Sequence, residues 1–159
     1  MDIEFRKFDN KAELFDFICE KLRLIGEECD DQTAVLANLS ALIMLEFDKL
    51  NWAGFYLLKG GELILGPFQG KPAAAKIPIG KGVCGTAVSE RKPQLVEDVH
   101  TCCKHIACDA ATNSELVVPI IRNGEIIGVI DLDSPIPARF DNDDKEGFER
   151  VSNILSEII

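Results

Sequence analysis

One segment near the C-terminal end constrains the fold more than any other. Residues 115–134 read ELVVPIIRNGEIIGVIDLDS, two apolar runs joined by the dipeptide Asn123–Gly124. Asn-Gly between two apolar runs is the strongest short-range signal for a β-hairpin, because both residues accept the positive φ that a type I′ turn requires. The sequence therefore predicts two neighbouring antiparallel strands here, and a fold that contains an antiparallel sheet.

More strands are predicted upstream of this hairpin. Residues 51–70, NWAGFYLLKGGELILGPFQG, have the pattern of a strand, a Gly-Gly turn and a second strand. Residues 84–92, CGTAVSERK, suggest one short helix, and residues 94–99, QLVEDV, suggest another strand. We expect a central, mostly antiparallel sheet of about six strands.

Helical patterns flank this region on both sides. Apolar residues recur at helical spacing from about residue 10 to residue 45, where Asp31 or Thr33 is a candidate cap for a second helix. Residues 140–159 form an amphipathic pattern with acidic residues in its first turn. The order predicts an α+β fold in which the sheet packs against N- and C-terminal helices, as one domain over residues 1–159.

Charge excludes two classes of partner. A net charge of -10 and a pI near 4.7 would repel nucleic acid and anionic membranes. The N-terminal residues contain no apolar run of the length that a signal peptide or a transmembrane segment needs, so we expect a cytoplasmic protein. Thiols stay reduced in that compartment, and the six cysteines therefore favour packing, metal or redox chemistry over a disulfide framework.

Residues 100–109, HTCCKHIACD, concentrate three cysteines and two histidines in a segment expected to be a loop. Zinc is disfavoured because the adjacent Cys102 and Cys103 cannot easily direct both sulfurs at one tetrahedral ion. A permanent disulfide is disfavoured by the compartment. A catalytic thiol and incidental cysteines stay equally open on the residues alone.

Seven stretches together narrow the choice: NWAGFYLL, LGPFQGKPA, IPIGKGVCGTA, VEDVH, HIACDAATNSE, VVPI and GVIDLDS. In this order and spacing, residues 51–144 resemble the free methionine-(R)-sulfoxide reductases, a family built on the GAF fold. The resemblance implies a GAF-like domain with the long cysteine-containing loop over the pocket.

The resemblance also implies roles for two thiols. Cys108, the cysteine of HIACD, would attack the sulfoxide sulfur and become a sulfenic acid while methionine leaves. Cys84, the cysteine of GVCG, would condense with it to a disulfide that thioredoxin reduces. Most family members carry a further cysteine in a KPAC stretch, where this chain has Ala74. Cys102 and Cys103 are therefore possible auxiliary thiols, or flexible surface residues.

A substrate pocket is implied for Trp52, Glu115, Asp131 and Asp133, which match the family's aromatic and acidic set. Asp131 and Asp133 alternate along a predicted strand, so both point to the same face, where acids suit the ammonium of a free amino acid. The solvated face of an edge strand is the alternative for these acids. Trp52 would pack on the methyl group of the substrate, and otherwise it is a core residue.

These observations predict an enzyme that reduces free methionine-(R)-sulfoxide, without a cofactor or a metal. Its expected partners are the substrate, thioredoxin and a second copy of the chain, paired through terminal helices. Two alternatives stay open. One is a non-catalytic GAF domain that senses a small ligand, and the other is a thiol redox or zinc-binding protein that uses the cysteine doublet.

Overall fold

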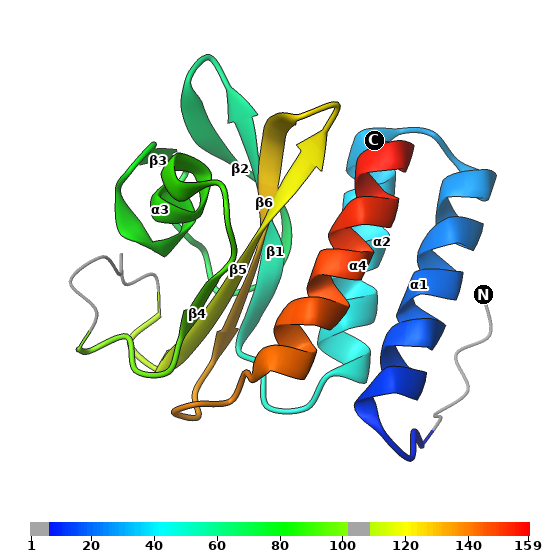
Figure 1. Cartoon of the computed structure of the whole chain (residues 1–159), viewed down its shortest axis with the longest axis horizontal. Coiled ribbons are helices and arrows are strands. Elements are labelled where there is room, and N and C mark those ends of the chain that lie inside the picture. The colour runs from blue at the N-terminus through cyan, green and yellow to red at the C-terminus, as the bar shows by residue number, and fades with distance from the viewer. Residues whose placement is uncertain (1–6, 102–108) are drawn as a thin grey trace.

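The computed structural model describes residues 7–101 and 109–159 of the chain. It confirms the α+β class and the six strands (Figure 1). In chain order the elements are α1 (Lys11–Glu28), α2 (Gln32–Glu46), β1 (Trp52–Lys59), β2 (Glu62–Gly70), β3 (Lys76–Pro78), α3 (Gly82–Glu90), β4 (Gln94–Val96), β5 (Ser114–Arg122), β6 (Glu125–Ser134) and α4 (Asn142–Ile158).

The strands form one sheet in the order β3-β2-β1-β6-β5-β4, and every neighbouring pair is antiparallel. Both predicted hairpins are confirmed. Asn123 and Gly124 turn with φ of 52° and 79°, and Gly60 and Gly61 turn with φ of 59° and 81°. β6 lies in the interior of the sheet between β1 and β5, so it is not the edge strand that a solvated acidic face would need.

Side-chain caps fix where the long helices begin. The Asn10 side chain accepts a hydrogen bond from Glu13 N at the start of α1, and Asp31 accepts from Ala34 N at the start of α2. Asp31, rather than Thr33, is therefore the cap of the second helix. Asp141 and Asp144 form a reciprocal capping box at the start of α4.

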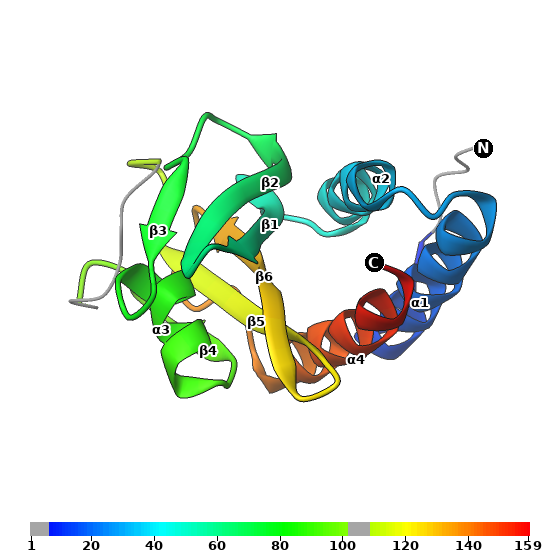
Figure 2. The same ribbon diagram turned by 90° about the horizontal axis from the view of Figure 1, so that it is seen from above.

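The three long helices cover one face of the sheet, with α2 against β1 and β2, α4 against β5, and α1 packed on α2 and α4 (Figure 2). Phe15, Phe47 and Phe148 join these helices, with ring centroids 5.0 to 5.3 Å apart. Gly147 lets α1 and α4 approach closely, because a Cβ there would lie 2.3 Å from the Phe15 ring. Among the described residues, no helix is both long and apolar enough to cross a membrane.

The opposite face of the sheet carries α3 and a second, smaller apolar cluster that includes Trp52, Tyr56 and Cys84. The helix sits directly on the end of β3, since a Cβ on Gly85 would lie 2.4 Å from the carbonyl oxygen of Pro78. Side chains on this face are thus enclosed between the sheet and α3, and the predicted acidic residues belong to it.

Candidate active site

Strand register places the predicted pocket residues side by side. Asp133 of β6 is paired with Trp52 of β1 on one side and with Glu115 of β5 on the other. The three side chains therefore share one row across three strands and point to the face that α3 covers. Asp131 follows on the same face of β6, opposite Gly54. The prediction that Asp131 and Asp133 share a face is confirmed, and both are buried.

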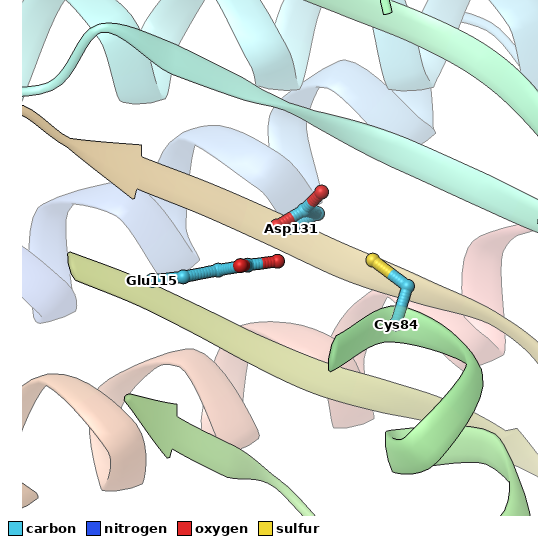
Figure 3. Close-up of side chains that lie close together, drawn as sticks. All are labelled: Cys84, Glu115 and Asp131. Atoms are coloured by element: carbon cyan, nitrogen blue, oxygen red, sulfur yellow. The ribbon is translucent and has the colours of Figure 1, made fainter. Parts of the chain in front are cut away.

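Cys84 reaches this row from the first turn of α3. Its Sγ, one carboxylate oxygen of Glu115 and one of Asp131 all lie within 4.8 Å of one another. Figure 3 shows the three side chains converging from α3, β5 and β6. The Cys84 thiol is hydrogen-bonded to the Asp131 carboxyl group, and Asp131 is hydrogen-bonded to Glu115. One thiol and two acids thus form a connected, buried group.

Burial controls the protonation of this group. Loss of water around Glu115, Asp131 and Asp133 raises the pKa of each carboxyl group well above its ordinary value, and the neighbouring acids raise the pKa values further. Burial, followed by the charges of Asp131 and Glu115, likewise raises the pKa of the Cys84 thiol. Burial therefore favours the protonated form of each of these acids and of the Cys84 thiol.

Two carboxylate oxygens in the site have no hydrogen-bond partner among residues 7–101 and 109–159: Oδ1 of Asp131 and Oδ1 of Asp133. Their residues are 7% and 6% exposed. A buried polar atom without a partner is costly, and most such atoms in folded proteins are satisfied. These oxygens are available to a ligand that brings hydrogen-bond donors or positive charge.

Trp52 forms a rigid wall beside the acids. Its ring stacks on Phe68, with centroids 5.2 Å apart, and on Tyr56, with centroids 6.1 Å apart. Two glycines make room for the indole, because a Cβ would lie 2.8 Å from its Cη2 at Gly54 and 2.5 Å from its Cδ1 at Gly70. The indole is only 2% exposed, so its orientation is set by packing.

Asp109 anchors the residues that follow the cysteine-rich segment. It accepts hydrogen bonds from Asn51 Nδ2 at 3.1 Å, from Lys71 Nζ at 3.2 Å and from Ala111 N at 2.9 Å. The Ala111 N–H is the main cause that lowers the pKa of the Asp109 carboxyl group. Asn51 also donates to Thr112 Oγ1 at 3.0 Å. Asp109 thus hydrogen-bonds loop backbone at Ala111, and the same carboxylate joins these residues to Asn51, which precedes β1, and to Lys71 in the β2–β3 connection.

His100, before the cysteine-rich residues in the chain, has its Nε2 2.9 Å from Asn113 Oδ1. The predicted nucleophile Cys108 and the predicted auxiliary thiols Cys102 and Cys103 lie outside the described residues. Their assignments stay predictions.

Comparison with known proteins identifies the family of this chain. Residues 31–159 match the GAF domain family. The chain is 50% identical over 126 residues to the free methionine-R-sulfoxide reductase of Escherichia coli K12, covering 79% of this chain and 76% of that protein. It belongs to the free methionine-R-sulfoxide reductase family.

Solved structures of the family agree with the fold. The Neisseria meningitidis free methionine-R-sulfoxide reductase in complex with its substrate has a TM-score of 0.93 at 36% identity, covering 99% of this chain and 95% of that one. The reduced Staphylococcus aureus enzyme has a TM-score of 0.86 at 52% identity, covering 90% of this chain and 93% of that one.

Against this family background, the structure brings together Cys84, Trp52 and the three acids, whereas sequence reasoning singled out neither Asn51 nor Lys71. Both residues lie in stretches that carry the resemblance, but their role as hydrogen-bond donors to Asp109 is seen only in the structure. Ala74 is partly buried beside the apolar cluster of Cys84, and its carbonyl oxygen accepts a hydrogen bond from Tyr56 Oη at 2.9 Å.

Proposed function

We propose that this chain reduces free methionine-R-sulfoxide to methionine, with Cys108 as the nucleophile. The observation that carries the proposal is the row of Trp52, Asp133 and Glu115, completed by Asp131 and Cys84, in a member of this family. A site with one aromatic wall and several buried acids suits a small zwitterion that has a cationic end and an apolar cap.

Recognition of the substrate ammonium follows from the buried acids. The pKa values of Glu115, Asp131 and Asp133 are raised because their charges are buried near one another. An ammonium group offers three donors and one positive charge, which satisfies the unpartnered oxygens of Asp131 and Asp133 and offsets the repulsion. The methyl group on the sulfoxide sulfur would then pack on Trp52.

The chemical step transfers one oxygen atom. The Cys108 thiolate attacks the sulfoxide sulfur, the sulfur–oxygen bond of the substrate breaks, and the oxygen ends on the cysteine sulfur as a sulfenic acid. The substrate sulfur gains two electrons and leaves as methionine, while the cysteine sulfur loses two. Transfer needs a proton on the departing oxygen, and the hydrogen-bonded pair of Asp131 and Glu115 can supply one, because burial raises the pKa of both carboxyl groups.

Recycling returns Cys108 to the thiolate. The Cys84 thiol gives its proton to the Asp131 carboxyl group, with which it is hydrogen-bonded, and its sulfur attacks the sulfenic acid. A disulfide forms and water leaves with the sulfenic oxygen. Thioredoxin would then reduce the disulfide by exchange. Cys102 and Cys103 are the auxiliary thiols in this proposal, since Ala74 supplies none.

We also propose that the chain works in the cytosol as a homodimer. Leu24 of α1 and Leu45 of α2 are 46% and 45% exposed and supply apolar surface that a second copy would cover. Light scattering on the purified chain measures its mass directly, and a monomer at micromolar concentration would contradict this part of the proposal.

Substrate selectivity tests the proposed function. The thioredoxin-coupled rate is measured with the R and S epimers of free methionine sulfoxide and with the N-acetylated R epimer. We expect turnover with the free R epimer only, because acetylation removes the ammonium that the buried acids bind. Equal rates with the free and the acetylated R epimer would contradict the role of the acids.

A further inference from the structure

We propose that Cys84, Glu115 and Asp131 also form a binding site for Zn²⁺, and that zinc bound there withdraws Cys84 from the redox cycle. This group of three residues is called the thiol–acid cluster below. It comes from three separate elements, α3, β5 and β6, so no ligand spacing in the sequence points to a metal. Its residues meet only in the folded chain (Figure 3).

The spacing of the ligand atoms suits one ion. Sγ of Cys84 and one oxygen from each acid lie within 4.8 Å of one another. With Zn–S near 2.3 Å and Zn–O near 2.0–2.2 Å, a tetrahedral ion holds such ligands roughly 3.3–3.6 Å apart. A contraction of at most about 1.5 Å, from 4.8 Å to about 3.3 Å, brings the three atoms to these distances, and small rotations of the three side chains can supply it.

Two unpartnered oxygens point independently to a positive ligand. Oδ1 of Asp131, inside the cluster, and Oδ1 of Asp133, on the same face of β6, have no hydrogen-bond partner in the described part of the chain. Both residues are more than nine-tenths buried. Asp133 lies directly opposite Glu115, so its carboxylate is placed beside the cluster. A water bound by Asp133 can occupy the fourth position of a tetrahedral ion.

The donor set selects the metal. One thiolate and two carboxylates are ligands that Zn²⁺ and Co²⁺ accept, whereas Mg²⁺ and Ca²⁺ require oxygen alone. The Cys84 thiolate can bond to zinc, whereas a substrate ammonium interacts only with the acids. Binding must displace the proton on Cys84 and any proton shared by Asp131 and Glu115, as metal binding to thiols and acids generally does.

The consequence for catalysis rests on the proposed function. A Cys84 thiolate that is bound to zinc cannot condense with the Cys108 sulfenic acid, and the ion occupies the acids that would bind the substrate ammonium. Zinc and methionine-R-sulfoxide therefore exclude each other. Zinc binding itself does not depend on turnover, so the two proposals can fail separately.

Metal titration of the full-length chain tests the site. Cys102, Cys103 and Cys108 are first replaced by serine, because these thiols are also capable of binding zinc. The reduced protein is titrated with Co²⁺, followed by Zn²⁺. We expect one equivalent of Co²⁺ with a thiolate-to-metal charge-transfer band, complete displacement by Zn²⁺, and weaker zinc binding when methionine-R-sulfoxide is present.

Variants assign the ligands. In the same background, Cys84→Ser must abolish the charge-transfer band. Cys84→Ser and Glu115→Gln must each lower the affinity for Zn²⁺ by more than the roughly 10–100-fold loss that is typical when a residue next to the metal ligands is changed. Cys19→Ser is the matched control, since Cys19 is a buried thiol of the other apolar cluster and must leave binding unchanged. Absence of the band before Cys84 is replaced, or its persistence in Cys84→Ser, overturns the proposal.

Discussion

Asp133 lies directly opposite Glu115 on the neighbouring strands β6 and β5, and both carboxyl groups are buried. Like charges at paired positions in a sheet destabilise the fold, and burial increases their cost. Burial raises the pKa of both carboxyl groups and so favours their uncharged forms, whereas a cationic ligand favours their charged forms. The arrangement therefore links stability, pH and ligand binding.

Stability of the ligand-free protein should fall as pH rises above the unfolded-state carboxyl pKa of about 4. Burial raises the folded-state pKa values of Glu115, Asp131 and Asp133 above their unfolded values of about 4. A raised carboxyl pKa gives stability that is fully present below the unfolded pKa and lost as pH rises through the folded pKa. Each kcal/mol lost lowers Tm by roughly 2–4 °C in a chain of this size.

Thermal unfolding between about pH 5 and pH 8 measures the effect. Asp131→Asn should flatten the dependence of Tm on pH, while Glu20→Gln, at an exposed position of α1, should leave it unchanged. A Tm that is constant or rises from pH 5 to pH 8 in the parent chain would show that ionisation of the buried acids does not destabilise the fold.

Gly54→Ala should disturb both the fold and the pocket. A Cβ there would lie 2.3 Å from Phe68 Cβ and 2.8 Å from Trp52 Cη2, so the indole or β2 must move. Overpacking of this kind costs about 1–3 kcal/mol, and displacement of Trp52 should raise the KM for the sulfoxide. Urea unfolding and steady-state kinetics measure the two effects. Gly60→Asn is the control, because nothing lies within 4 Å of that position and asparagine tolerates its φ of +59°.

Asp109→Ala should lower kcat/KM by on the order of 100-fold, because a small misplacement of a reacting group can cost that much. Asp109 adjoins the proposed nucleophile and accepts hydrogen bonds from Asn51, Lys71 and Ala111. Lys71→Met removes only one partner, which is 70% exposed, and should change the rate little. The comparison is made by thioredoxin-coupled kinetics, and equal losses in both variants would argue against Asp109 as the anchor.

Ala74→Cys should rescue a chain that has lost its resolving thiol. Cys84→Ser removes the thiol that condenses with the sulfenic acid, and thioredoxin-dependent turnover should fall while the first methionine is still made. Because Ala74 lies beside the apolar cluster of Cys84, a thiol introduced there should restore turnover through a disulfide with Cys108, visible by intact mass. If Cys84→Ser keeps the parent turnover, resolution belongs to Cys102 or Cys103.

Local signals predicted much of this fold. Asn123–Gly124 and Gly60–Gly61 specify their hairpins because few other residues adopt positive φ at such turns. Alternation along β6 predicted that Asp131 and Asp133 share a face. Their burial was not predictable in this way, because it depends on β6 lying between β1 and β5, which is set by pairing between distant segments.

The contacts that could not be predicted from the sequence join residues that are far apart in the chain. Cys84 meets Asp131 only after α3 folds back over the sheet, and Asn51 meets Asp109 across 58 positions. The short strand β3 was not predicted as a separate element, since three residues carry no measurable period.

A single-turnover assay tests the central claim most directly. Pre-reduced protein is mixed with excess free methionine-R-sulfoxide without any reductant, and methionine is counted per chain for the parent, Cys108→Ser and Cys84→Ser. The account predicts about one methionine per chain for the parent and Cys84→Ser, and none for Cys108→Ser. Methionine from Cys108→Ser, or none from a parent chain that binds the sulfoxide, would contradict it.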